Sequence, residues 1–290
     1  MTFRPFTYTS FDGLRLAGRI YGEEGGRGTP VLCLAGLTRN SADFDALARY
    51  LASGAGGSRR VVTLDMRGRG ESERPPDGRY DLGDEARDAL DGAVAAGLHE
   101  FALVGTSRGA ILAMLIAAIR PGVLASVVMN DLGPVLEPEG LRALRDTLDA
   151  RVDATSWDEA IAALRLAYVD EFPALDDARW ARFARAIMTE RDGRIVGAYD
   201  PAIVASLDGP LDLPPMWSSF AALRAVPVLS VRGERSTLFS ATVQTEMQRR
   251  HPALDVLVVP GEGHAPRLDD EPTMAAVAAF LNRRPRSRND

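Results

Sequence analysis

Short apolar runs alternate with segments of helical periodicity along most of the chain. The apolar runs are bounded mainly by Gly, Pro, Asp or Arg, a pattern typical of buried strands. In the segments between them, apolar residues recur every three or four positions, as on an amphipathic helix. The predicted strands occupy 6–9, 14–21, 31–34, 61–64, 101–104, 124–129, 226–231 and 255–259. The predicted helices occupy 42–51, 83–96, 107–119, 241–249 and 272–281.

Regular alternation of strand and helix predicts a mainly parallel sheet with helices on both faces, because a parallel connection needs a crossover helix. The first two strands have no helix between them and predict an antiparallel hairpin that turns at Asp12 and Gly13. The fold class predicted from the pattern is therefore α/β, with an eight-stranded, mainly parallel sheet.

The alternation stops between about 134 and 212. This interval holds no convincing strand, but it has amphipathic stretches at 141–152, 157–168 and 177–188 and is rich in aromatic residues. We expect a helical insertion between two strands of the sheet. The predicted division of the chain is a core formed by 1–133 and 213–290, with a helical insertion at 134–212.

Composition restricts the classes of function. The chain has 290 residues, 46% of them hydrophobic, which is enough to bury a large core. Its net charge is -6 with no basic block, which argues against nucleic acid or an anionic membrane as a partner. The apolar run 111–119 is too short to span a bilayer, and the first residues lack the apolar region of a signal peptide, so we expect a cytoplasmic protein.

Metal and cofactor signals are weak throughout the sequence. There is one cysteine, Cys33, within a predicted buried strand, so we expect a packed thiol and no disulfide. No H-E-x-x-H motif, cysteine pair or glycine-rich dinucleotide loop is present. We therefore expect neither metal nor cofactor.

The strongest chemical signal is a G-x-S-x-G pentapeptide, GTSRG at 105–109, between a predicted strand and a predicted helix. In this context the pattern is typical of a nucleophile elbow, a tight turn that lifts the serine hydroxyl clear of the sheet. Flanking glycines avoid the collision that a Cβ would cause there. Ser107 is the candidate nucleophile.

A nucleophilic serine needs a base, because its hydroxyl is a poor nucleophile at neutral pH. The chain has 3 histidines. His264 follows the last predicted strand, at the carboxyl edge of the sheet where open α/β folds bind ligands, and is the candidate base. We expect His99 and His251 to be ordinary surface residues.

These motifs, in this order, resemble those of the α/β-hydrolase superfamily. Besides the elbow, residues 65–72 (DMRGRGES) are similar to the family's D-x-R-G-x-G-x-S loop, and 261–266 (GEGHAP) to its histidine loop. The resemblance implies that the insertion is a cap over the active site. A serine at the elbow separates the chain from the epoxide hydrolases and haloalkane dehalogenases of this fold, which use aspartate. For Arg67 we favour a structural turn over a catalytic role.

The resemblance also implies an oxyanion hole built from two backbone N–H groups, those of Leu37 and Arg108. The histidine commonly found before the loop's glycine is replaced by Ala35. The side chains of Arg39 and Asn40 either line the pocket or cap the following helix.

The acid of the triad departs from the usual pattern. Most relatives place it after the seventh strand, where this chain reads RGERST at 232–237, with serine at the aligned position. Asp131, after the sixth strand, resembles the acid of relatives that use this other location, and we favour it over Glu234. The other interpretation of Asp131 is a turn residue at the end of a strand.

Together these features predict a serine hydrolase that cleaves a small or medium carboxylic ester or lactone through an acyl-enzyme intermediate, in a capped, largely apolar pocket. Two alternatives stay open at this point: a carbon–carbon bond hydrolase of the same fold, and a small-molecule receptor of this fold without turnover. The sequence leaves the oligomeric state open.

Overall fold

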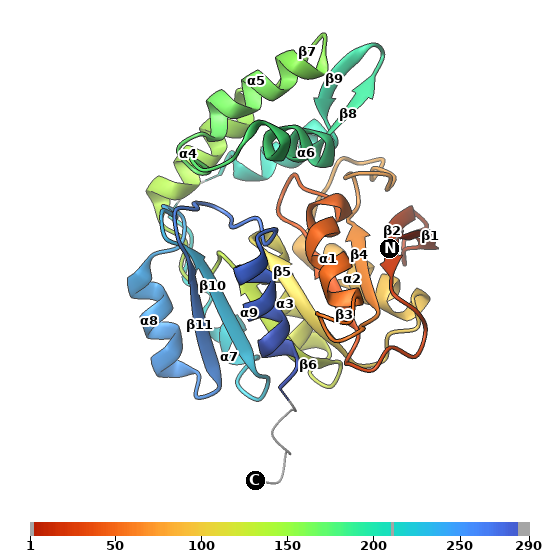
Figure 1. Cartoon of the computed structure of the whole chain (residues 1–290), viewed down its shortest axis with the longest axis vertical. Helices are drawn as coiled ribbons and strands as arrows, with labels where there is room; N and C mark the ends of the chain where they lie inside the picture. The colour runs from red at the N-terminus through yellow and green to blue at the C-terminus, as the bar shows by residue number, and fades with distance from the viewer. Residues whose placement is uncertain (1–2, 210–211, 284–290) are drawn as a thin grey trace.

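An eight-stranded sheet forms the centre of the computed structural model, which describes residues 3–209 and 212–283 (Figure 1). Residues 1–2 and 284–290 of the predicted core and residues 210–211 of the predicted insertion therefore lie outside the described part. The spatial order is β1-β2-β4-β3-β5-β6-β10-β11. The strands are β1 (Arg4–Thr9), β2 (Arg15–Tyr21), β3 (Val31–Leu34), β4 (Val61–Asp65), β5 (Phe101–Thr106), β6 (Leu124–Asn130), β10 (Val228–Gly233) and β11 (Leu254–Val259).

The sheet is mainly parallel, as predicted. β1 pairs with β2, and β2 with β4, in antiparallel register, whereas every pair from β4 to β11 is parallel. The β1–β2 turn contains Gly13 at φ +92°, a left-handed conformation that glycine adopts without a steric penalty. The expected hairpin and the α/β fold class are both confirmed.

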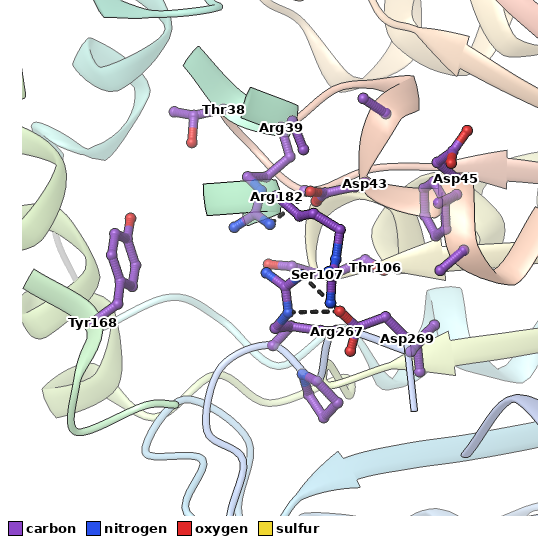
Figure 2. A pocket seen from close by; sticks show the side chains of 18 of the residues that line it. Thr38, Arg39, Asp43, Asp45, Thr106, Ser107, Tyr168, Arg182, Arg267 and Asp269 are labelled. Carbon is purple, nitrogen blue, oxygen red and sulfur yellow. Dashed lines mark hydrogen bonds and ion pairs between the residues drawn. The ribbon is translucent and has the colours of Figure 1, made fainter. Parts of the chain in front are cut away.

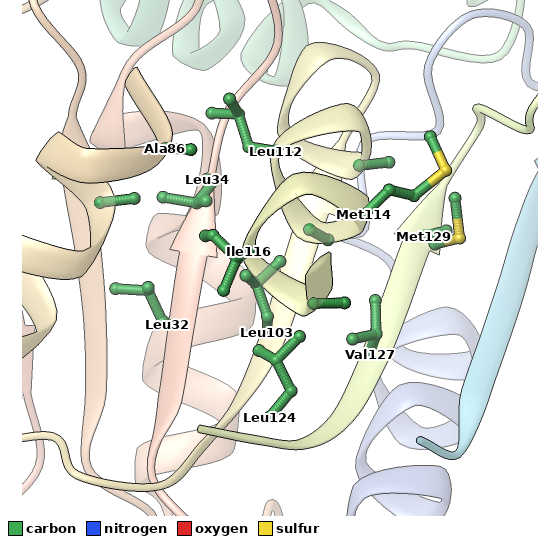
Figure 3. Close-up of a cluster of buried hydrophobic side chains, with 14 of the residues drawn as sticks. Leu32, Leu34, Ala86, Leu103, Leu112, Met114, Ile116, Leu124, Val127 and Met129 are labelled. Carbon is green, nitrogen blue, oxygen red and sulfur yellow. The ribbon is translucent and has the colours of Figure 1, made fainter. Parts of the chain in front are cut away.

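Helices cover both faces of the sheet, and the alternation of side chains along each strand determines the two cores. Leu32 and Leu34 of β3 pack on one face with α2 and α3. Figure 3 shows these leucines with Leu112 and Ile116 of α3. The helices of the core are α1 (Asp45–Ala52), α2 (Leu82–Ala95), α3 (Arg108–Ile119), α7 (Trp217–Ala221), α8 (Ala241–Arg250) and α9 (Glu271–Leu281).

The intervening residues of β3, Val31 and Cys33, pack on the opposite face against α1 and α9. Cys33 is fully buried and its thiol is free, as predicted. Because both faces of β3 are covered, all four of its residues are apolar. A strand of this kind does not alternate between polar and apolar residues.

The described residues of 134–212, here called the inserted segment, lie between β6 and β10 in the chain and above the ends of the strands in Figure 1. Phe172, Trp180 and Phe183 belong to a separate apolar cluster within it. Its helices and strands are α4 (Pro138–Asp149), α5 (Trp157–Tyr168), α6 (Asp177–Ile187), the 3-10 helix η2 (Pro201–Leu207), β7 (Asp153–Ala154), β8 (Met188–Arg191) and β9 (Arg194–Gly197).

The expectation that this segment contains no strand is wrong. β7, β9 and β8 form a three-stranded antiparallel sheet. The β8–β9 turn uses Asp192 and Gly193, both at positive φ. Strands of two to four residues are too short to show a two-residue period, so the longer helical pattern around them dominated the sequence signal.

Among the described residues, no helix is both long enough and apolar enough to cross a membrane.

Candidate active site

Ser107 stands in the turn between β5 and α3 at φ +51° and ψ −114°, a conformation that side chains other than glycine seldom adopt. Its backbone N–H donates to the carbonyl of Asn130 at 2.9 Å, which ties the turn to β6. A Cβ on Gly105 would lie 2.4 Å from the carbonyl oxygen of Gly109, and one on Gly109 would lie 2.1 Å from that of Leu34. Both glycines of the motif are therefore sterically required.

His264 lies on the loop between β11 and α9, and its imidazole reaches the serine. Its Nε2 is 2.9 Å from Ser107 Oγ, within hydrogen-bond distance. The other ring nitrogen, Nδ1, is 2.8 Å from Asp131 Oδ2. The structure thus brings together the three residues selected from the sequence, in the order hydroxyl, imidazole, carboxylate.

Asp131 is fully buried directly after β6, at φ +56°. Its Oδ2 faces His264, and its Oδ1 accepts a hydrogen bond from the backbone N–H of Gly233 at 2.7 Å. Its own N–H donates to the carbonyl of Val231 at 2.8 Å. These contacts with β10 hold the carboxylate in one orientation toward the imidazole.

Glu234, the alternative acid, is exposed and directed elsewhere. Its Oε2 accepts from the backbone N–H of Gly261 at 2.8 Å. No hydrogen bond or ion pair joins it to His264 in the described part of the chain. The structure therefore does not bring Glu234 to the imidazole.

The loop after β3 lies beside the serine. A Cβ on Gly36 would lie 3.7 Å from Ser107 Cβ, so the loop lies beside Ser107 at the residue before Leu37. Arg108 is the first residue of α3, where a backbone N–H has no acceptor within the helix. Both predicted oxyanion-hole residues are consequently next to Ser107.

A buried ionic network, which the sequence analysis missed, links these two residues. The guanidinium of Arg69 donates to the carbonyl of Leu37 at 2.8 Å and to Glu85 Oε1 at 2.5 Å. Glu85 Oε2 accepts from Arg108 Nε at 2.6 Å. Burial lowers the pKa of Arg69, and Glu85 is fully buried. Because its partners are distant in sequence, no local motif marks Glu85 as part of the site.

Arg67, in the same loop, donates to Asp88 at 2.6 Å and to Asp12 at 3.0 Å. These contacts tie the loop to α2 and to the β1–β2 turn, as expected of a structural residue.

Glu171, in the inserted segment, is a second residue that the sequence did not reveal. Its Oε2 accepts from the backbone N–H of His264 at 2.6 Å, and its backbone carbonyl accepts from Gly263 N–H at 2.8 Å. A Cβ on Gly263 would lie 1.6 Å from the same Oε2. Burial, the dominant effect, raises the pKa of Glu171. The inserted segment thus contacts the histidine loop directly.

A cavity of about 640 Å³ opens in front of Ser107 and His264, between the core and the inserted segment (Figure 2). Leu37 and Tyr168 contribute apolar surface, while Trp157, Phe172 and Trp180 are not among the lining residues. The wall also has charged groups, of which only Arg39 was considered for the pocket from the sequence. They are Arg19, Arg39, Arg182, Arg185, Arg267, Asp43, Asp45 and Asp269.

Arg39 and Asn40 divide the two roles considered for them. Arg39 lines the cavity and pairs with Asp43 at 2.6 Å. Asn40 caps the following 3-10 helix, where its Oδ1 accepts from Ala42 N–H at 2.9 Å. Its Nδ2 also donates to the carbonyl of Ala186 at 2.9 Å, a contact with the inserted segment.

The expectation that His251 is a surface residue is wrong. It is 2% exposed, its Nε2 lies 2.9 Å from the carbonyl oxygen of Leu223, and its ring contacts Phe220. The sequence did not indicate this burial, because the neighbouring residues Arg249, Arg250 and Pro252 are polar or exposed. His99 is exposed, as expected. In residues 3–209 and 212–283, no group of three or more His, Cys, Asp or Glu side chains is arranged to hold a metal ion.

Comparison with known proteins identifies close similarity over nearly the whole chain. Residues 31–279 match the model of the alpha/beta hydrolase family. The chain is 32% identical over 263 residues to the 2-(acetamidomethylene)succinate hydrolase of Mesorhizobium japonicum. The aligned residues cover 89% of this chain and 90% of that protein. It is 30% identical over 265 residues to the 3-hydroxybutyrate-oligomer hydrolase of Cupriavidus necator, covering 87% of each.

The chain is also similar in fold to a solved structure. The crystal structure of an alpha/beta hydrolase from Novosphingobium aromaticivorans superimposes with a TM-score of 0.87 at 37% identity. The match covers 96% of this chain and 98% of that one.

Proposed function

The chain belongs to the alpha/beta hydrolase family, and we propose that it is a serine hydrolase that cleaves a small or medium carboxylic ester or lactone. One observation carries the proposal. Ser107 Oγ, the His264 imidazole and the Asp131 carboxylate form a continuous chain of contacts at 2.9 Å and 2.8 Å. This is the arrangement of nucleophile, base and orienting acid that acyl transfer through serine requires.

In the proposed first step, Ser107 Oγ attacks the substrate carbonyl carbon while its proton passes to His264 Nε2. Asp131 accepts the Nδ1–H, which keeps the other nitrogen free as a base and stabilises the imidazolium that forms. The tetrahedral intermediate collapses, and the leaving alcohol takes the proton from His264. The acyl group is then bound to Ser107 as an ester.

In the second half, a water molecule gives a proton to His264 and attacks the acyl-enzyme carbonyl. The bond to Ser107 Oγ breaks, the serine recovers its proton, and the carboxylic acid leaves. In both halves, the backbone N–H groups of Leu37 and Arg108 stabilise the oxyanion. The network through Arg69 and Glu85 supports this assignment, since it fixes both residues before the substrate arrives.

We further propose that 134–212 acts as a cap domain over a core formed by 1–133 and 213–290. The cavity between them supports this division, because its lining comes from both parts. The contacts of Glu171 with the histidine loop and of Asn40 with Ala186 attach the cap to the core near the site. A cavity of about 640 Å³ is suited to a small or medium substrate, and the names of the relatives, which include 2-(acetamidomethylene)succinate and 3-hydroxybutyrate oligomers, agree with this.

Turnover of 4-nitrophenyl acetate and butyrate tests the proposal. A serine hydrolase should release nitrophenol over many cycles per molecule, at a rate that is proportional to enzyme concentration. A single burst equal to the protein concentration, followed by arrest, would instead indicate a receptor that is acylated without turnover, and the absence of any reaction with these or lactone substrates would contradict the ester and lactone assignment.

A further inference from the structure

One face of α6 is turned toward the cavity that contains Ser107. Ala181, Arg182, Arg185 and Ala186 all line it, and the pairs 182/185, 181/185 and 182/186 are three or four positions apart, which places them on the same side of the helix. The two alanines have short side chains, so the arginines are the longer of the α6 side chains that line the cavity. Figure 2 shows Arg182 together with Ser107, Arg39 and Arg267 in this pocket.

Of the three other arginines in the cavity wall, two have their charge compensated by a carboxylate. Arg39 pairs with Asp43 at 2.6 Å, and Arg267 pairs with Asp269 at 2.7 Å. Both guanidinium groups also lie over the ring of Phe183, at 4.5 Å and 4.7 Å from its centroid. Their charges are compensated within the protein, and their positions are fixed by the aromatic contact.

Arg182 and Arg185 differ from these two. Neither guanidinium forms an ion pair or a hydrogen bond with another group in the described ranges. Arg185 lies over the indole of Trp157 at 4.2 Å, a contact that orients the guanidinium through its face and leaves the N–H groups at its edge available. Like charges three positions apart on a helix repel each other, so a bound anion would relieve a repulsion that the protein leaves uncompensated.

We propose that Arg182 and Arg185 form a carboxylate-binding subsite, so that the substrate is an ester whose acyl part ends in a free carboxylate away from the scissile bond. This inference rests on the proposed serine hydrolase function and names its substrate class. Carboxylate is suited to the planar donor edge of arginine, with which it forms charge-assisted hydrogen bonds. The subsite lies on the inserted segment and the nucleophile on the core, so the substrate would bridge the two.

Matched substrates test the subsite. The 4-nitrophenyl half-esters of succinic, glutaric and adipic acid, each paired with its methyl diester, differ only in the free carboxylate; spontaneous hydrolysis is subtracted. We expect the wild type to prefer at least one half-ester roughly tenfold or more in kcat/KM. In the double variant Arg182→Gln/Arg185→Gln that preference should be lost, because kcat/KM for the half-ester falls roughly tenfold or more through KM rather than kcat.

Arg142→Gln is the matched control, because Arg142 is an exposed arginine of α4 outside the cavity lining. It removes one positive charge from the inserted segment, where the double variant removes two, and should leave the preference unchanged. The wild-type preference should also decrease with ionic strength, since an ion pair open to solvent is screened. Equal use of half-esters and diesters by the wild type would overturn the subsite, as would an equal loss on both in the double variant.

Binding without catalysis separates this inference from the proposed function. Ser107→Ala protein is titrated calorimetrically with free succinate, glutarate and adipate, and the same titration is repeated after adding Arg182→Gln/Arg185→Gln. Saturable binding that is lost with the arginines supports the subsite even if no ester is turned over. Absence of binding by all three dicarboxylates, in a protein that hydrolyses neutral esters, would overturn the subsite and leave the hydrolase intact.

Discussion

The Asp131 carboxylate accepts a hydrogen bond from His264 Nδ1–H at 2.8 Å, although the two residues lie on different loops, after β6 and after β11. The other carboxylate oxygen is held by the N–H of Gly233, at the end of β10. The end of β10 therefore orients a carboxylate that follows the neighbouring strand, β6.

This relationship predicts different outcomes for the two candidate acids. Asp131→Asn keeps the shape of the side chain but favours the wrong imidazole tautomer. It should lower kcat by on the order of 10⁴, as the same substitution of the triad acid does in a serine protease. Glu234→Gln should lower kcat roughly tenfold or less, since exposed charges have weak effects. Steady-state kinetics on one ester decide the matter, and a larger loss in Glu234→Gln would reverse the assignment.

Glu171 predicts a specific dependence of stability on pH. Burial raises its pKa above the ordinary value of 4.5, so the folded protein binds its proton more tightly than the unfolded chain does. The contribution of Glu171 to the free energy of unfolding should therefore fall as pH rises from 4.5 through the folded pKa.

The measurement for Glu171 is urea unfolding of wild type and Glu171→Gln at a series of pH values. Glutamine does not titrate, so the stability of the variant relative to wild type should increase across this interval and level off above it. A relative stability that decreases with pH there would mean that the hydrogen bond from the His264 N–H, and not burial, dominates the titration of Glu171.

Glu85 predicts a large effect on stability. It is fully buried and compensates two guanidinium groups, those of Arg69 and Arg108, at 2.5 Å and 2.6 Å. Glu85→Ala leaves these charges without their acceptor and should destabilise the fold by about 3–5 kcal/mol. Denaturant unfolding measures this, with the exposed Glu190→Ala as a control expected to change stability by less than about 0.5 kcal/mol. A loss below about 1 kcal/mol would contradict the role given to the network.

The cavity predicts a preference for short acyl chains. A volume of about 640 Å³ accommodates a small or medium acyl group and its leaving alcohol. With a series of 4-nitrophenyl esters of unbranched acids, kcat/KM should be greatest for short chains and should decrease as the chain grows. A maximum at acyl chains longer than about eight carbons would require a larger pocket than the one described.

Much of the core could be predicted from the sequence because its signals are local. The apolar run 31–34 indicates a buried strand, and the glycines around Ser107 indicate a tight turn. Each signal is contained in a few adjacent residues. The bounds of α5, Trp157–Tyr168, were also predicted. Its apolar residues recur periodically over about three turns, and Ser156 caps its first turn.

The parts that were missed depend on contacts between distant segments. Glu85 lies on an ordinary amphipathic helix, and Glu171 in a loop, so neither shows a pattern before the chain folds. His251 looked exposed because its neighbours are arginines, although its ring packs against Phe220. The short strands β7 to β9 pair only with one another, and a pairing of that kind has little signature in a two- to four-residue run.

Covalent labelling of Ser107 tests the central claim most directly. A fluorophosphonate probe reacts with a serine whose hydroxyl is activated by a base, and intact-mass analysis followed by peptide mapping identifies the modified residue. We predict one adduct per chain, located on Ser107, with labelling abolished by Ser107→Ala and strongly slowed by His264→Ala. Labelling at another residue, or undiminished ester turnover by the Ser107→Ala protein, would contradict the account.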